Sequence, residues 1–137
     1  MLRPFDAIEW VAHRVIGGAI EVHRTLGPGL LEAVYRECLT VELRDRGMLV
    51  ECECAVPIVY KGRRVKCPLK IDLLVERSVV VEVKAVNRLH PVYDAQLITH
   101  LTLAGFQAGL LLNFNEVLLK NGLRRLDHPN RYAKTHN

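Results

Sequence analysis

Length, composition and charge describe a small folded domain of basic character. The chain has 137 residues, of which 50% are hydrophobic and 25% are charged, so it can form a core and widespread disorder is not expected. Its formal net charge of +4 mildly favours a polyanionic partner. No apolar run approaches the roughly 18 residues that span a bilayer, and the N-terminus lacks the apolar block of a signal peptide. We therefore expect a cytoplasmic protein without membrane contact.

The N-terminal third has the apolar spacing of two helices. Apolar residues recur at helical intervals over residues 6–24, with Asp6 as the expected N-terminal cap. The glycines and proline of residues 26–29 end this helix. A second helix is predicted over residues 30–46, followed by Gly47 where a left-handed C-terminal cap is common. The side chains expected along its inward side are those of Leu31, Val34, Tyr35, Cys38 and Leu39.

The pattern changes to strands at Met48. Apolar residues occupy every second position over residues 48–60, which predicts a strand interrupted at Pro57, and residues 61–63 form a turn. A turn near Arg77 leads to another strand over residues 79–84. Between them lies a strand with two predicted faces, one bearing Val65, Cys67, Leu69, Ile71, Leu73 and Val75, the other bearing Lys66, Lys70, Asp72 and Glu76.

The C-terminal part adds a helix and a buried strand. The helix begins near His90 and Pro91 and stops at Gly105, and the apolar run 108–114 reads as a buried strand. A short last strand over residues 123–126 follows, and the polar tail 127–137 is expected to be flexible. The order is helix, helix, three strands, helix, strand. It predicts an α/β domain over residues 1–126, with one sheet flanked by helices.

Acidic and basic residues converge on one hairpin if its loop comprises residues 76–78. Val75 then lies opposite Val79, and Asp72 lies opposite Glu82 with Cβ atoms about 5 Å apart. Lys84 shares the face of Glu82, because side chains alternate along a strand. A two-residue loop would place the two acids on opposite faces unless a bulge intervened.

Converging carboxylates suit a particular chemistry. Mg²⁺ takes oxygen ligands, often one or two carboxylates, and can activate water and neutralise the charge that develops during phosphodiester hydrolysis. The alternative is an ordinary solvated face of an amphipathic hairpin, which spacing alone favours. Two opposed carboxylates shift the balance towards a cation site, since like charges across a strand pair are destabilising.

The motif residues resemble a known family. Asp72 followed by Glu82-Val83-Lys84 resembles the catalytic signature of the PD-(D/E)XK nuclease superfamily. Residues 29–35, GLLEAVY, resemble the motif that names the GxxExxY protein family, and residues 19–29 and 110–115 are similar to that family too. The resemblance covers about residues 16–126. It implies a restriction-endonuclease-like core with a central mixed β-sheet, and a metal-dependent nuclease that hydrolyses phosphodiester bonds of nucleic acid, with DNA favoured over RNA.

The resemblance also implies roles for individual residues. Asp72, Glu82 and the helix residue Glu32 would bind Mg²⁺, with Mn²⁺ as a substitute. Lys84 would position or activate the attacking water, and Gln96 would lie near the scissile phosphate. A solvated glutamate in a first helical turn is the alternative for Glu32.

Three further residues are candidates for substrate contact, namely Tyr35, His100 and Lys70. The family usually has a tyrosine four residues after the glutamine, where this chain has His100, which shares a helix face with Gln96. His100 could contact phosphate or be an indifferent surface histidine. Tyr35 is expected to place its ring in the core and its hydroxyl at the edge of the site.

Two other interpretations remain open. Cys52, Cys54 and Cys67 could suggest zinc, but core packing is favoured because Cys52 and Cys54 fall on the apolar face of their strand and structural zinc needs four spaced ligands. The domain could also be a catalytically silent module that binds nucleic acid or a protein partner. Its size leaves little room for a separate DNA-gripping region, which favours a partner or a homodimer. Basic side chains that could contact a nucleic-acid backbone, or simply be solvated, are Lys61, Arg63, Arg64, Lys66, Arg124 and Arg125.

Overall fold

The computed structural model describes residues 4–131. Three α-helices are present in this range: α1 (Pro4–Leu26), α2 (Glu32–Asp45) and α3 (Pro91–Ala104). A short 3-10 helix, η1 (Leu119–Gly122), precedes the last strand. The strands are β1 (Val50–Val56), β2 (Val59–Tyr60), β3 (Arg63–Arg64), β4 (Leu69–Val75), β5 (Val79–Lys84), β6 (Ala108–Asn113) and β7 (Leu123–Asp127). No helix among the described residues is long and apolar enough to cross a membrane.

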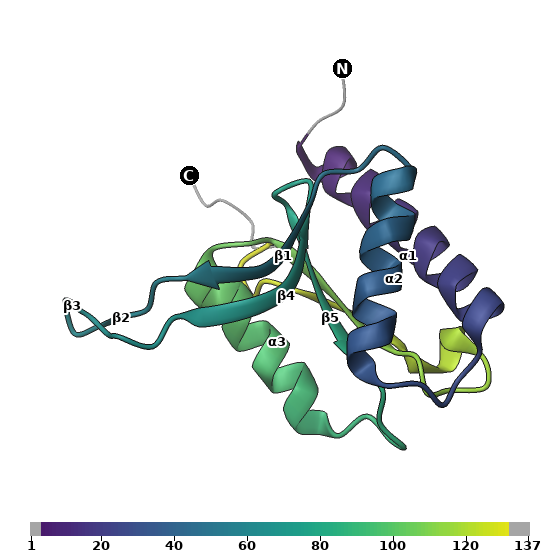
Figure 1. Cartoon of the computed structure of the whole chain (residues 1–137). Helices are drawn as coiled ribbons and strands as arrows, with labels where there is room; N and C mark the ends of the chain where they lie inside the picture. Colours follow the sequence, from purple (N-terminus) through teal and green to yellow (C-terminus); the bar gives the residue numbers. More distant parts are fainter. Residues whose placement is uncertain (1–3, 132–137) are drawn as a thin grey trace.

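Five strands form one mixed sheet in the order β1-β4-β5-β6-β7. Strands β5 and β6 run parallel, and the other neighbours are antiparallel. Helices α1 and α2 cover one face of the sheet and α3 covers the other (Figure 1). The predicted α/β class, with a mixed central sheet flanked by helices, is confirmed. The small β2–β3 hairpin projects away from this body (Figure 1).

The first two helices differ from the prediction at their ends and on one face. Helix α1 begins at Pro4, so Asp6 lies inside its first turn and the predicted cap is wrong. Helix α2 turns Tyr35, Leu39 and Leu43 inward at intervals of four residues. Leu31 is 77% exposed and Val34 is also exposed, so their predicted inward position is wrong. Gly47 has φ +82° and confirms the left-handed end of the helix.

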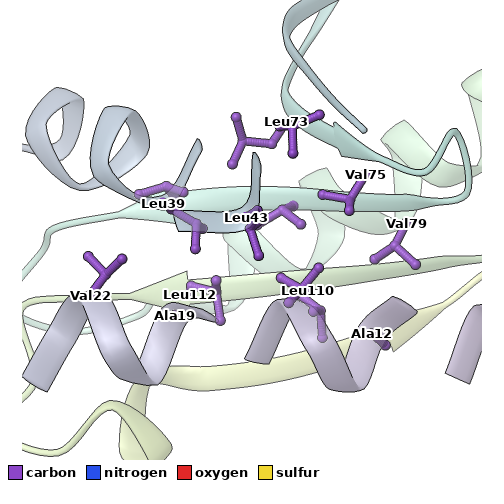
Figure 2. Close-up of a cluster of buried hydrophobic side chains, with 14 of the residues drawn as sticks. Ala12, Ala19, Val22, Leu39, Leu43, Leu73, Val75, Val79, Leu110 and Leu112 are labelled. Carbon is purple, nitrogen blue, oxygen red and sulfur yellow. The ribbon is translucent and has the colours of Figure 1, made fainter. Parts of the chain in front are cut away.

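The larger core cluster lies between the two N-terminal helices and the sheet. Figure 2 shows Leu39 and Leu43 of α2 facing Val75 and Leu110 of the sheet, with α1 closing the same layer. Residues 79, 81 and 83 of β5 contribute their side chains to this cluster. The other face of β5 is therefore turned towards α3.

Helix α3 packs closely on the second face. Its N-cap is His90, whose Nδ1 accepts the Val92 N–H at 3.0 Å, and its end is Gly105 in a left-handed conformation, as predicted. Leu97 is fully buried in the smaller core cluster. A Cβ at Gly109 of β6 would lie 2.8 Å from a Leu97 methyl carbon, so this glycine permits the close approach of α3.

Strands β1 and β4 switch faces midway along their length. Leu73 and Val75 belong to the larger core cluster, whereas Ile71 belongs to the smaller one, so the predicted single apolar face of this strand is wrong. The switch coincides with Glu53 of β1, which has φ +48° and is skipped in an otherwise constant register.

The same switch separates two cysteines. Cys52 is exposed and lies 3.4 Å from the Thr40 hydroxyl of α2, whereas Cys54 packs on the α3 side. The prediction that both thiols share a buried apolar face is therefore wrong. Within the described part of the chain, Cys38, Cys52, Cys54 and Cys67 are free thiols.

The beginning of the expected flexible tail is held in place. Asp127 ends β7, and Arg131 bonds both Asp127, at 2.9 Å, and Glu9 of α1, at 2.9 Å. The Arg131 side chain is only 2% exposed. The prediction of flexibility therefore does not hold for residues 127–131, and its remainder, residues 132–137, lies outside the described range.

Candidate active site

The β4–β5 hairpin has the loop that the acidic site requires. Val75 pairs with Val79, which confirms the predicted three-residue loop over 76–78. Glu76 and Arg77 both adopt left-handed φ values, +52° and +53°, and Ser78 donates its N–H to the Val75 carbonyl at 3.0 Å. The predicted register on which the acids depend is therefore present at the loop end of the hairpin.

Asp72 lies where β4 and β5 separate. The last backbone pair between these strands joins Leu73 and Val81. Beyond it, the Val83 N–H donates to Oδ2 of Asp72 at 3.0 Å instead of to a strand carbonyl. The bond fixes the carboxylate at the edge of β5, with 21% of the side chain exposed. Where β4 and β5 separate, the Val83 N–H therefore bonds and positions the Asp72 carboxylate.

Glu82 is the most buried acid of the site. Its side chain is 10% exposed, and Oε1 lies 3.2 Å from Nδ1 of His100, a hydrogen bond in which an ionised carboxylate is the acceptor. Burial raises the pKa of Glu82 above its ordinary value, the His100 hydrogen bond opposes this shift, and the nearby charge of Asp72 adds to it. The two predicted metal ligands, Asp72 and Glu82, are thus close enough to interact electrostatically, and the Glu82 carboxylate is largely shielded from solvent.

Lys84 points to the same helix as Glu82. Both side chains leave the α3 face of β5, and the Lys84 Nζ lies 4.8 Å from the centroid of the Tyr93 ring. An ammonium over an aromatic face is held by electrostatic attraction to the ring. Tyr93 lies in the first turn of α3, two turns before His100, so the helix contacts both candidate side chains of β5, Glu82 and Lys84.

The end of β5 is fixed by a buried amide. Asn113, fully buried at the end of β6, pairs with Lys84 in the parallel ladder. Its Oδ1 accepts the Val86 N–H at 3.0 Å and its Nδ2 donates to the Val86 carbonyl at 2.9 Å. These bonds set the direction in which the chain leaves the strand that carries Lys84.

Arg36 is a site residue that no sequence motif indicated. Its guanidinium lies 3.9 Å from Oδ1 of Asp72, 4.0 Å from Oε1 of Glu32 and 3.9 Å from Oε1 of Glu53. Arg36 follows Glu32 by four residues on α2, a spacing that places the two on one helix face. The four-residue spacing from Glu32 was the sequence feature that could have indicated Arg36 as a neighbour of the site.

The geometry differs from the predicted three-acid set. Glu32 reaches Asp72 only through Arg36, which contacts both acids. Among the described residues, no three His, Cys, Asp or Glu side chains form a group that could hold a metal ion. The structure therefore brings Asp72 and Glu82 together and leaves Glu32 apart.

The remaining candidates occupy different positions. Gln96 is exposed on α3, and Lys70 is exposed on β4 two residues before Asp72. The Tyr35 ring is fully buried and stacks on Phe114 at 4.8 Å. Its hydroxyl donates to the Gly27 carbonyl at 2.5 Å and accepts the Leu30 N–H at 3.1 Å. This hydroxyl holds the loop between α1 and α2.

Comparison with protein families identifies this arrangement. The family model of the PD-(D/E)XK nuclease superfamily matches residues 9–126, which include most of α1, all of α2 and α3, and all five strands of the sheet except the last residue of β7. The chain belongs to the PD-(D/E)XK nuclease superfamily. No curated protein and no solved structure matches the chain.

Membership in the PD-(D/E)XK nuclease superfamily indicates a nuclease-type function and contact with nucleic acid. Nucleases of this superfamily generally depend on a divalent metal. The donor chemistry fits such an ion, since Mg²⁺ is commonly bound through one or two carboxylates, with waters and substrate phosphates as the other ligands. Asp72 and Glu82 meet that requirement without a third acid.

A cavity of about 580 Å³ lies elsewhere on the protein, away from Asp72 and Glu82. It is lined mainly by apolar side chains of α1 and the η1 region, including Ile20 and Leu118, with none of the candidate acids. The charged groups of the candidate site lie instead at the opening between β4 and β5.

Proposed function

We propose that this protein is a metal-dependent nuclease that hydrolyses phosphodiester bonds. The observation that carries the proposal is the buried Glu82 carboxylate beside Asp72. Burial and the neighbouring charge both raise its pKa, so the ionised pair is unfavourable without a cation. A structural role would be served better by an uncharged residue, because a buried charge costs free energy unless it is paired.

Asp72 and Glu82 would hold the metal, with Mg²⁺ as the natural ion and Mn²⁺ as a substitute. A divalent ion at this position would supply Lewis acidity and lower the pKa of water. Asp72 is already oriented by the Val83 N–H, and Glu82 by His100. Such fixed ligands favour binding because little side-chain freedom is lost.

The chain's own cations would act on phosphate and water. The Lys84 ammonium, held over Tyr93, would donate hydrogen bonds that orient the attacking water or stabilise the charge developing on phosphate oxygens. Arg36 carries fixed positive charge beside Asp72 and could contact a phosphate. Gln96 and His100 share one face of α3, and on this basis Gln96 would contact substrate beyond His100.

Finer assignments are extensions of this proposal. DNA is favoured over RNA as the substrate, membership of the GxxExxY family stays a prediction from residues 29–35, and the cytoplasm is the expected location. The Tyr35 hydroxyl, which bonds two backbone groups, is better suited to holding its loop than to binding substrate.

The test is cleavage by purified protein in Mg²⁺ or Mn²⁺. We expect labelled DNA to be cut, and Glu82→Ala or Lys84→Ala to abolish cutting while circular dichroism shows an intact fold. Glu37→Ala, which removes an exposed carboxylate of α2, should cut normally. Equal cutting by the wild type and both site variants would refute the assignment.

The second candidate is a catalytically silent module that binds nucleic acid or a protein partner. One observation favours it: Arg36 lies within 4.0 Å of Glu32, Glu53 and Asp72, so part of the acidic charge already has a cationic neighbour. Titration with Mn²⁺ separates the candidates. Binding that is lost in Glu82→Gln supports the nuclease, and a lack of binding by the wild type supports the silent module.

A further inference from the structure

The positive charge of the chain is concentrated in the segment that contains the projecting β2–β3 hairpin and the start of β4. Five Lys and Arg residues lie between Glu53 and Asp72, with no Asp or Glu among them. The chain has 19 Lys and Arg and 15 Asp and Glu in total, so the remainder has 14 against 15, a formal charge of −1. The net charge of +4 therefore comes from one segment instead of being spread over the surface. The five residues are Lys61, Arg63, Arg64, Lys66 and Lys70.

The hairpin is separated from the sheet by two opposed prolines. The last pair of the β1–β4 ladder joins Val56 and Leu69. The next positions in that register are Pro57 and Pro68, and neither can donate a ladder hydrogen bond. Residues 57–68, here called the basic arm, therefore lie outside the five-stranded ladder and project from the body of the protein (Figure 1).

The cations of the basic arm are available to a partner. Residues 59–68 are all exposed. Among the described residues, none of the five cations of this region takes part in an ion pair with a carboxylate. At the tip, the Lys61 ammonium lies 5.4 Å from the centroid of the Tyr60 ring, which is itself exposed. Unpaired like charges on a narrow hairpin repel one another, and a polyanion relieves that repulsion.

The arm and the candidate active site share one strand. Strand β4 begins at the arm, continues through Lys70 and reaches Asp72. Arg63 is nine residues from Asp72 along the chain, which corresponds to at most about 30 Å. Phosphates on one strand of a duplex are spaced by about 3.4 Å along the helix axis, so the arm can reach phosphates up to about nine nucleotides along the duplex from the bond at Asp72.

We propose that the basic arm is the nucleic-acid grip of this protein, binding the phosphate backbone of a duplex whose scissile bond lies at Asp72 and Glu82. The proposal rests on the proposed nuclease function and adds how the substrate is held. Contacts to phosphate carry no sequence information, so the arm provides affinity without sequence preference. A charged arm of this kind supplies the separate gripping region that a small domain otherwise lacks.

The test is binding of the wild type in EDTA, where the salt dependence reports phosphate contacts. Anisotropy of labelled 20-base-pair DNA and RNA duplexes is measured at several salt concentrations. The arm variant carries Lys61→Ser, Arg63→Ser and Arg64→Ser. The matched control removes the same charge at three exposed cations outside the arm, with Arg24→Ser, Arg77→Ser and Lys120→Ser.

The expected result is specific to the arm. Each lost phosphate contact reduces the magnitude of the slope of log K against log salt by about 0.9. The slope of the arm variant should therefore be smaller in magnitude by up to about 2.7. At moderate salt the arm variant should bind the duplex about tenfold or more weakly than the wild type. The control should keep the wild-type slope. Equal slopes in the arm variant and wild type, equal losses in the arm variant and control, or no duplex binding by the wild type would each overturn the proposal. Preference between the two duplexes identifies the sugar that the grip favours.

Failure of the grip and failure of the nuclease give different results. Duplex binding that depends on the arm, without cleavage in Mg²⁺ or Mn²⁺, keeps the grip and removes the nuclease. Cleavage by a protein whose duplex affinity is unchanged in the arm variant keeps the nuclease and removes the grip.

Discussion

Replacing Glu82 by glutamine should stabilise the folded protein at neutral pH while removing its activity. The side chain is 10% exposed and its pKa is raised, first by burial and then by Asp72. Glutamine has the same shape and no charge, and its amide oxygen can still accept the His100 hydrogen bond. The substitution therefore removes the cost of an ionised buried group and keeps the contact.

The magnitude and its pH dependence follow from linkage. Below about pH 4.5, Glu82 is protonated in both the folded and the unfolded state, so Glu82→Gln should have little effect on stability. As pH rises, the unfolded state ionises first and the wild type loses relative stability until the pH passes the raised pKa of the folded state. Each unit of elevation corresponds to about 1.4 kcal/mol, or about 5 °C in Tm for a domain of this size.

The assay is urea unfolding in EDTA at several values between pH 4 and pH 8. The stability difference between Glu82→Gln and the wild type should be near zero at pH 4 and favour the variant at pH 8. Glu37→Gln, which neutralises an exposed carboxylate, should show no such rise. A variant that is less stable than the wild type at pH 8, or a gain of equal size at every pH, would refute the account of the site.

Three other substitutions test how the site is supported. Asn113→Ala should lower the free energy of unfolding by about 2–3 kcal/mol, because it leaves the buried backbone groups of Val86 unpaired; unchanged urea unfolding would contradict this. Tyr35→Phe should cost about 1 kcal/mol and leave the rate constant for cleavage unchanged, whereas a loss of cleavage at full stability would favour a substrate role. Gly109→Val should cost about 1–3 kcal/mol by clashing with Leu97, and equal stability of this variant and the wild type would show that α3 can move aside.

The central hairpin was predictable because local chemistry determines it. The three residues between Val75 and Val79 were enough to set its register at the loop. Helix α3 was equally accessible, since Pro91 and Gly105 mark its two ends. The closeness of Asp72 and Glu82 followed from this register, but their predicted ladder pairing did not form, because the β4–β5 ladder ends at Leu73 and Val81.

The surroundings of the site depend on contacts that local patterns do not encode. A left-handed glutamate at position 53 has no residue-type signal, yet it accompanies the switch that turns Ile71 away from Leu73. Arg36 reaches Asp72 only because α2 packs beside the opening of β4 and β5. The predicted role of Glu32 as a metal ligand did not anticipate this neighbour.

The basic arm is only partly predictable from the sequence. Residues 61–63 have the pattern of a turn, and several cations around them are candidates for contact with a nucleic-acid backbone. Their projection from the sheet depends on Pro57 and Pro68 being opposite one another, which becomes visible only once β1 and β4 are in register. The prediction that the domain has little room for a separate DNA-gripping region did not include this projection of residues 57–68.

The most direct test of the nuclease site pairs Mn²⁺ binding with cleavage in Lys84→Met and Glu82→Gln. Methionine keeps an unbranched side chain against Tyr93 and removes only the ammonium. We predict that Lys84→Met binds Mn²⁺ as the wild type does in calorimetric titration but cleaves duplex DNA about 10²–10⁴-fold more slowly. Glu82→Gln should lose both Mn²⁺ binding and cleavage. Mn²⁺ binding of equal affinity in Glu82→Gln and the wild type, or full cleavage by Lys84→Met, would contradict the account.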